Sequence, residues 1–231
     1  MLQAFAHPGR VLRRPRTLRT LALVAWLAAP VLAAAQSAAP HACGDPFRNH
    51  FGPWDYRSAE RANIAIVEKH HFTPGIEAMV QPVNTTMRDM AQDVQYTLAV
   101  FPNHHRALLT MARLAEKHLA DPPPGSNYSV DCWFDRAIRF RPDDTVVRSL
   151  YALQLAKRKR LPEAEAQLEA AVAAAKDNPL SHYNIGLVYF DIGNPERALG
   201  QAHKALAMGV TRTELADKLK AAGKWRDPPA Q

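Results

Sequence analysis

Apolar residues recur every three or four positions from about residue 84 onward, which is the spacing of one face of an α-helix. The first of these runs has apolar residues at Met87, Met90, Val94, Leu98 and Phe101. Asn84 or Thr85 is expected to cap this helix, because a short polar side chain can accept a hydrogen bond from a free backbone amide. Further helices are predicted over the ranges 104–119, 130–140 and 211–222.

The chain before this region lacks such regularity. Residues 36–50 are rich in Ala, Pro and polar side chains, which is typical of a linker. The aromatic residues of the segment 51–57 are expected to anchor that segment on the helical part. Apolar and polar positions are mixed between residues 58 and 82, and a Pro-Gly pair at 74–75 interrupts them. We therefore expect residues 36–83 to form an irregular segment that packs on the helices.

The C-terminal half of the chain repeats itself with a period of 34 residues. After a shift by this period, Gly186 overlies Ala152 and Tyr189 overlies Leu155. Two pairs of alanines coincide in the same way, Ala198 with Ala164 and Ala205 with Ala171. In its period and in these small and aromatic positions, the chain resembles the tetratricopeptide repeat family.

The resemblance covers roughly residues 84–224 and implies an all-α solenoid, in which pairs of antiparallel helices stack on one another. We expect about three repeats, preceded by a half-repeat and followed by a C-terminal capping helix. The first repeat is longer than the period allows, and a Pro-rich loop at residues 121–126 accommodates the extra length. Residues 225–231 are expected to be a tail.

The family also implies a peptide-binding groove, which the first helix of each repeat would line. Its residues would be Arg106, Leu109, Arg113, Lys117, Val146, Ser149, Leu153, Lys157, Leu180, Tyr183, Asn184, Leu187 and Phe190. Such a groove is basic at one end and apolar at the other, so it suits an extended peptide with an acidic portion and an apolar anchor. Alternatively, these residues form ordinary solvated helix faces.

The first 35 residues differ in character from the rest of the chain. Five arginines between Arg10 and Arg19 stand without an acidic residue, and an apolar run over residues 21–32 follows. Three alanines at 33–35 then offer a cleavage site, so residues 1–35 are predicted to be a secretory signal peptide. The apolar run is shorter than the roughly 20 residues of a membrane-spanning helix. We expect export to a bacterial periplasm without stable membrane insertion after cleavage; an uncleaved N-terminal anchor is the alternative.

This leader changes the meaning of the net charge. The chain has a formal net charge of +7, and the leader contributes five arginines and no acid, which leaves +2 (7 − 5) for the remainder. A strongly basic protein would suggest a nucleic-acid partner. Because most of the basic charge lies in the leader, we expect no nucleic acid as a partner.

The chain has two cysteines, Cys43 and Cys132. An oxidising compartment allows them to pair, and neither has another cysteine as a partner. We therefore expect a disulfide that ties the N-terminal segment to a helix of the first repeat. The alternative is two free thiols, one buried and one in a loose segment.

No pattern in the sequence points to catalysis or to a bound cofactor. The histidines include two adjacent pairs, His70-His71 and His104-His105, but neighbours on a helix point in different directions and form a poor metal chelate. The sequence contains no nucleophile elbow, no glycine-rich phosphate loop and no paired-cysteine motif. We therefore predict neither an enzyme nor a metal protein.

These observations favour an exported, non-enzymatic scaffold that binds a protein or peptide. The competing hypothesis places a metal-binding or catalytic site in residues 43–82, which contain the dense run Trp54-Asp55-Tyr56-Arg57. A self-associating structural protein is a third hypothesis, and the sequence leaves the oligomeric state open.

Overall fold

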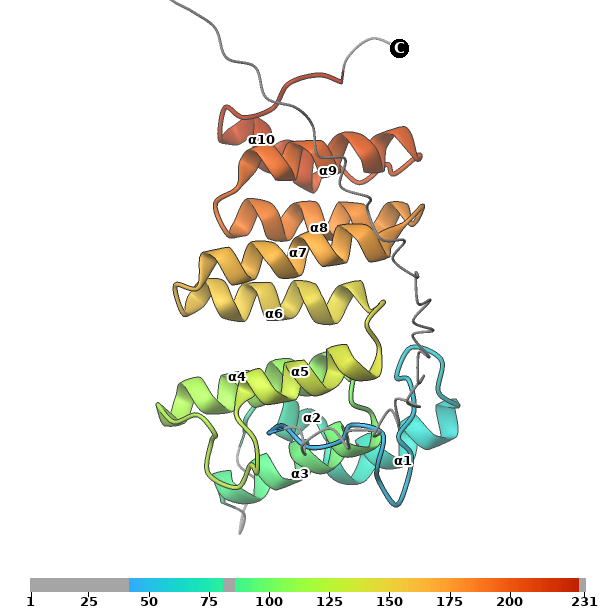
Figure 1. The fold of residues 1–231 in the computed structure, drawn as a ribbon, viewed down its shortest axis with the longest axis vertical. Helices are drawn as coiled ribbons and strands as arrows, with labels where there is room; N and C mark the ends of the chain where they lie inside the picture. The colour runs from blue at the N-terminus through green and yellow to red at the C-terminus, as the bar shows by residue number, and fades with distance from the viewer. Residues whose placement is uncertain (1–41, 81–85, 229–231) are drawn as a thin grey trace, which may run out of the picture. The chain divides into compact units, whose positions relative to one another are not determined.

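The computed structural model describes residues 42–80 and 86–228. Within these residues every regular element is an α-helix, and no strand is formed (Figure 1). The helices are α1 (Arg61–His71), α2 (Pro74–Glu77), α3 (Met87–Val100), α4 (His105–His118), α5 (Val130–Phe140), α6 (Thr145–Lys157), α7 (Leu161–Ala175), α8 (Pro179–Asp191), α9 (Pro195–Ala207) and α10 (Glu214–Ala221). The predicted signal peptide, residues 1–35, lies outside the described residues.

Capping residues in the sequence set where the longer helices begin. The side chains of four residues accept hydrogen bonds from backbone amides in the first turns of α5, α6, α8 and α9, namely Ser129, Asp144, Asn178 and Asn194. These bonds satisfy amides that have no partner within the helix. The helices expected from the periodicity are therefore confirmed, with ends that shift by a few residues.

Helix α3 shows one such shift. Thr86 is its cap: the hydroxyl of Thr86 accepts from the amide of Asp89, and the Asp89 carboxylate accepts from the amide of Thr86. This reciprocal pair is a capping box. The cap is thus Thr86 rather than Asn84 or Thr85, both of which lie outside the described residues.

Helix α1 corrects the expectation that residues 36–83 are irregular, which holds for residues 42–60 but not beyond them. The sequence conceals α1 because Glu60, at its N-terminus, makes no side-chain cap. In addition, Val67 is the single residue of this helix that is fully buried. A helix with so narrow an apolar stripe leaves a weak periodic signal.

From α3 onward, consecutive helices pack against each other, most extensively within the pairs α6–α7 and α8–α9. Figure 1 shows these four helices side by side in chain order. The even-numbered helices also touch directly, α4 with α6, α6 with α8 and α8 with α10. Gly186 allows one of these approaches, because a Cβ atom at this position would lie 2.5 Å from Cδ2 of Leu215 near the start of α10.

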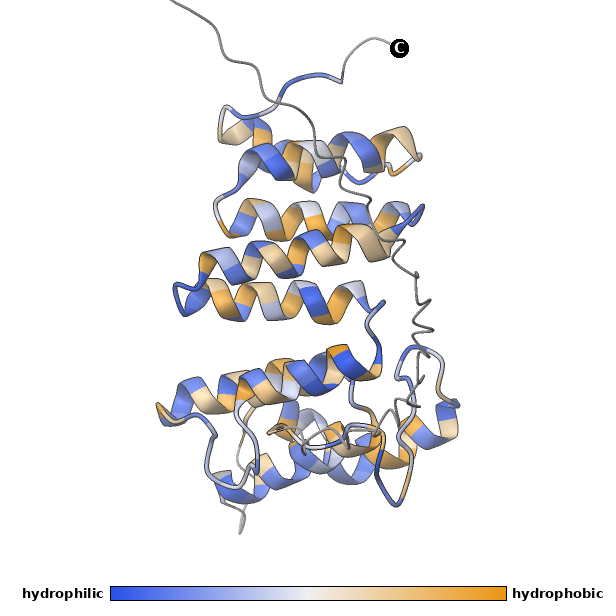
Figure 2. Cartoon of the chain, viewed as in Figure 1, coloured by the Kyte–Doolittle hydropathy of each residue, from blue (hydrophilic) through white to orange (hydrophobic). Residues whose placement is uncertain are grey.

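The buried apolar residues form two large clusters that meet at α6. One cluster draws on α2 to α6 and includes Met111 and Phe134, and the other draws on α6 to α10 and includes Leu168 and Tyr189. Tyr151 of α6 packs against both clusters. Figure 2 shows polar and apolar residues mixed around the helices, as expected when only part of each helix faces a core. In the described part of the chain, no helix has the length and hydropathy needed to cross a membrane.

Residues 42–57, which we call the arm, are fastened to the helices at several places. A disulfide joins Cys43 to Cys132 of α5 across a sequence separation of 89 residues, so the expected pairing is present. Further along, the backbone amide of Trp54 donates to the carbonyl oxygen of Val100 at 2.9 Å. The arm therefore packs on the helical part, as its aromatic residues predicted.

Candidate functional site

Two cavities that share Leu153 cross the surface of α4, α6 and α8. The larger, of about 610 Å³, extends from Leu109 and Arg113 of α4 past α6 to Ile192 at the end of α8. The smaller, of about 190 Å³, lies between α6 and α8 and includes Val146. We call the two cavities together the groove.

The groove contains a part of the residues that the family resemblance implied. Seven of them line it, namely Leu109, Arg113, Val146, Ser149, Leu153, Lys157 and Asn184. They come from three different helices that are far apart in the sequence. The contacts between the even-numbered helices bring these residues onto one surface.

Tyr183 is not a groove residue, contrary to the expectation. Its side chain is 3% exposed and belongs to the core cluster of α6 to α10. The reason is that α10 packs on α8, and Arg212, just before α10, lies 5.9 Å from the centre of the Tyr183 ring. Tyr183 therefore stabilises the fold and offers no surface to a partner.

Arg106 is also engaged within the protein. Its guanidinium group contacts the carboxylates of Glu68 and Glu77 at 2.6 and 2.7 Å, and it lies over the ring of Phe72. Arg106 therefore ties α4 to α1 and α2 instead of lining the groove.

The four remaining predicted groove residues lie outside the two cavities. Leu187 and Phe190 are half-buried against the core, and Phe190 has the ammonium group of Lys218 5.8 Å from its ring centre. Leu180 and Lys117 are exposed on α8 and α4. For Phe190 the reason is that α10 packs on α8 and places Lys218 over its ring.

The charges of the groove are concentrated in its larger cavity. Arg113, Lys157 and Lys159 line this cavity together with one acid, Asp191. Lys157 also pairs with Glu116 at 3.0 Å, but both side chains are about half exposed, so the pair holds Lys157 only weakly. The smaller cavity is lined by apolar and uncharged polar side chains. The groove is thus basic at one end and apolar at the other, as the sequence indicated.

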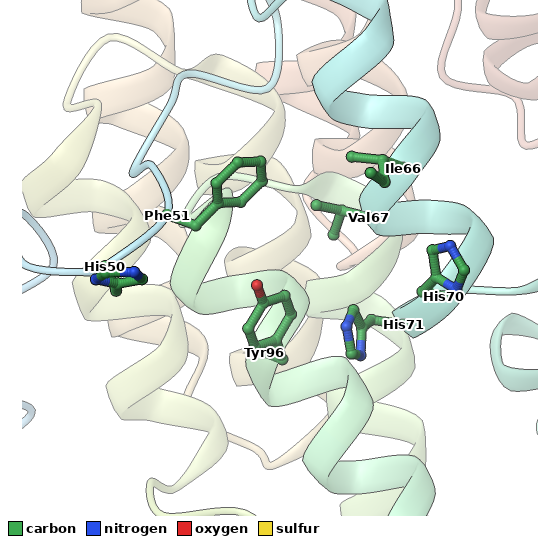
Figure 3. Close-up of a pocket in the computed structure, with 7 residues that line it drawn as sticks. All are labelled: His50, Phe51, Ile66, Val67, His70, His71 and Tyr96. Atoms are coloured by element: carbon green, nitrogen blue, oxygen red, sulfur yellow. The ribbon is translucent and has the colours of Figure 1, made fainter.

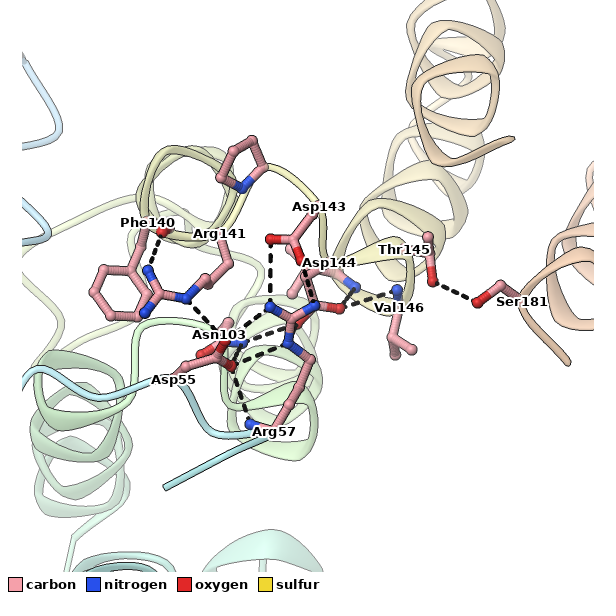
Figure 4. Close-up of polar contacts among 12 residues, drawn as sticks. Asp55, Arg57, Asn103, Phe140, Arg141, Asp143, Asp144, Thr145, Val146 and Ser181 are labelled. Atoms are coloured by element: carbon pink, nitrogen blue, oxygen red, sulfur yellow. Dashed lines mark hydrogen bonds and ion pairs between the residues drawn. The ribbon is translucent and has the colours of Figure 1, made fainter. Parts of the chain in front are cut away.

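A second cluster of polar residues, which the sequence did not reveal, joins the arm to the starts of α4 and α6 (Figure 4). Asn103 lies at its centre: its amide nitrogen donates to Asp55 at 2.7 Å and to Asp144 at 2.9 Å. The carbonyl oxygen of the same side chain accepts from the backbone amide of Tyr56 at 2.9 Å. The buried side chain of Asn103 therefore makes three hydrogen bonds, all with residues that are distant in the sequence.

Two arginines complete this cluster. Arg57 forms a two-point ion pair with Asp55, at 3.0 and 2.7 Å, and reaches Asp143 at 3.0 Å. Arg141 contacts the same Asp55 carboxylate at 2.8 Å. Burial opposes ionisation of Asp55, but the hydrogen bonds from Arg57, Asn103 and Arg141 outweigh it and hold the pKa of Asp55 far below its usual range. Asp55 is therefore a structural anion, fully engaged by cations of the protein.

His104 is a buried, neutral residue at the start of α4. Its Nδ1 atom accepts from the backbone amide of Ala107 at 3.1 Å, which leaves the proton on Nε2 to be donated to Glu68, also at 3.1 Å. The ring stacks on Tyr56 with centroids 3.9 Å apart. Burial lowers the pKa of His104 to about 4, although Glu68 acts in the opposite direction. His104 thus caps a helix and contacts both α1 and the arm.

We expect acid to destabilise the protein through His104 between pH 6.5 and 4. In this range the unfolded imidazole, with an ordinary pKa of 6.5, takes up a proton that the folded one, with a pKa of about 4, does not. Stability is therefore full above pH 6.5 and falls with decreasing pH, by up to about 3 kcal/mol. Urea unfolding at a series of pH values measures this slope.

His104→Asn supplies the matched variant for this measurement. Asparagine keeps an acceptor for the helix cap but does not titrate, so the slope should be smaller than in the wild type. An equal slope in wild type and His104→Asn would show that another group is responsible.

Two carboxylates of the segment 43–82, where the competing hypothesis places a site, are engaged within the protein. They are Asp55 and Glu68, which contact Arg57 and Arg106. Among the described residues, no group of three or more His, Cys, Asp and Glu side chains is arranged to hold a metal ion. The Nδ1–H group of His71 donates to the Asp93 carboxylate at 2.8 Å, and the neighbouring His70 is exposed.

Comparisons with known proteins yield no family model and no curated protein that matches this chain.

Proposed function

We propose that this protein is an exported, non-enzymatic scaffold of the tetratricopeptide kind, which binds an extended peptide segment of a partner protein in the groove. The observation that carries the proposal is the pair of cavities joined at Leu153, which crosses three helices that are far apart in the sequence. The repeat of the sequence pattern with a period of 34 residues supports this proposal. So do the direct contacts among α4, α6, α8 and α10, because stacked hairpins place alternate helices side by side.

The chemistry of the groove indicates which peptide it would take. Leu109, Leu153 and Ile192 offer an apolar surface for an anchoring side chain. Arg113, Lys157 and Lys159 supply positive charge beside this surface. An acidic stretch next to a large apolar residue would therefore match both features.

The proposed location is the bacterial periplasm. The leader-like composition of residues 1–35 supports export. The disulfide between Cys43 and Cys132 agrees with a compartment in which thiols are oxidised. Fractionation of cells that produce the protein, with N-terminal sequencing of the product, tests the location and the cleavage together.

Selection from a random peptide library tests the proposed ligand. We expect the purified protein to enrich peptides in which Asp or Glu adjoin a large apolar residue. Leu153→Asp should weaken a selected peptide at least about tenfold, because it places a carboxylate in the apolar part of the groove. Arg113→Glu should weaken it as well and reduce the salt dependence of binding. Isothermal titration calorimetry measures both effects.

Leu206→Asp is the control for these variants. Leu206 is 39% exposed on α9 and does not line the groove, so its substitution should leave the affinity unchanged. Peptides without acidic residues, or peptides that bind Leu153→Asp and Arg113→Glu as well as the wild type, would contradict the proposal.

A further inference from the structure

A separate pocket of about 420 Å³ lies between the arm, α1 and α3 (Figure 3). Residues from all three segments line it: His50, Phe51, Ile66, Val67, His70, His71 and Tyr96. None of them belongs to the groove. In Figure 3, His50 and His70 stand on opposite sides of the pocket, with Tyr96 and His71 next to each other between them.

The walls of the pocket are apolar and aromatic. Val67 is fully buried at its base, whereas Phe51, Ile66 and Tyr96 remain 37%, 52% and 39% exposed. Three exposed large apolar side chains in one pocket form an apolar surface, and binding a ligand there would be favoured because it removes this surface from water. The volume lies within the range of small-molecule sites, which are largely apolar with a few polar groups. Flat ring faces favour a planar aromatic ligand.

The lining residues of the pocket are held in place by contacts with one another and with their neighbours. Phe51 packs edge-on against Trp54, with centroids 4.7 Å apart, and the backbone of Trp54 is bonded to that of Val100. On the opposite wall, the His71 ring lies 4.1 Å from that of Tyr96, and Asp93 fixes its Nδ1 atom. Walls that are already positioned reduce the entropy lost when a ligand binds.

The polar groups of the pocket are three imidazoles and one phenol, without a carboxylate among the lining residues. No hydrogen bond joins the imidazole of His50 or His70 to another of the described residues. By contrast, His71, His104 and His105 are each bonded to a carboxylate. Imidazole N–H groups can donate to an anion, and a protonated imidazole would also attract it.

We propose that this pocket binds a small aromatic anion, with the aromatic body against Phe51, Ile66 and Tyr96. An imidazole stands at either side of the pocket, so His50 or His70 holds the anionic group. A cation is disfavoured because no lining side chain carries negative charge. The proposal concerns a second site, on different helices from the groove, and stands independently of the peptide-binding function.

Calorimetric titration with 1-naphthoate tests the proposal, with 1-naphthamide as its uncharged counterpart. We expect 1-naphthoate to bind at least about tenfold more tightly than the amide, because the carboxylate gains charge-assisted hydrogen bonds. The double variant His50→Ala/His70→Ala should abolish this preference and leave the affinity for the amide unchanged. Ile66→Asp should weaken both compounds, because it adds a negative charge to the apolar wall.

Two control variants locate the effect. Leu153→Asp alters the groove alone and should leave the binding of 1-naphthoate unchanged. The peptide-binding proposal and the proposal for this pocket can therefore fail independently of each other. His203→Ala removes a histidine on α9 and should also have no effect. The proposal is overturned if neither compound binds, if both bind equally, or if the preference for 1-naphthoate survives in the double histidine variant. Circular dichroism establishes that each variant is folded.

Discussion

Replacing Asp144 with alanine is expected to lower the free energy of unfolding by about 3–5 kcal/mol. The carboxylate of Asp144 is 1% exposed and accepts hydrogen bonds from Asn103 and His105, both at 2.9 Å. It also caps α6 by accepting from the amides of Val146 and Val147. Alanine would leave these buried donors without an acceptor, and unsatisfied buried groups cost more than the lost bonds alone.

The adjacent Asp143 provides a matched control. It also pairs with Arg57, at 3.0 Å, but its side chain is 64% exposed. Water can replace the lost contact, so Asp143→Ala should change the free energy of unfolding by less than about 1 kcal/mol. Chemical denaturation of the two variants measures both values. Equal losses at the two positions would contradict the role of Asp144 as a buried acceptor of this cluster.

Removal of the disulfide is expected to cost about 4–5 kcal/mol. The bond between Cys43 and Cys132 closes a loop with a sequence separation of 89, and the loss of unfolded-chain entropy grows with loop length. The double variant Cys43→Ser/Cys132→Ser, compared with the wild type by urea denaturation, gives this value. Reduction with dithiothreitol should shift the wild type to the stability of the double variant.

Dithiothreitol should have no effect on the double variant itself, because it contains no other cysteine. A loss below about 1 kcal/mol would contradict this account, because the full loss is expected when other contacts keep the arm in place after reduction. Such contacts exist: Arg136 donates to the carbonyl oxygen of Cys43 at 2.9 Å, and Arg139 donates to that of Gly44 at 2.7 Å.

Most helices could be predicted from the sequence because their signals are local. A capping residue such as Asp144 or Asn178 stands directly before its helix, and the apolar stripe runs along the helix itself. Both signals can therefore be read from a short stretch of sequence. Helix α1 lacks both signals, and its place depends on contacts with α3. Such a helix is stabilised mainly by tertiary packing, and its packing partners cannot be identified from a single sequence.

The candidate sites were predictable to a smaller extent. Leu153 and Arg113 could be assigned to the groove because the repeat places equivalent positions on equivalent faces. Tyr183 could not be assigned correctly, since its burial depends on how α10 covers α8. The polar cluster around Asn103 joins residues that are 41 to 48 positions apart, and no spacing rule in the sequence connects them.

The position of α6 between the two core clusters has a consequence for how the molecule unfolds. A stack of helical hairpins can lose its end units separately, because each unit contacts only its neighbours. Tyr151 of α6 counters this tendency: its ring stacks on Phe134 at 4.8 Å, and it also packs against the cluster of α6 to α10. Unfolding of one cluster therefore removes the contacts that Tyr151 makes with the other cluster. Residues 42–80 and 86–228 should accordingly melt in a single cooperative transition, with similar hydrogen-exchange protection in both clusters.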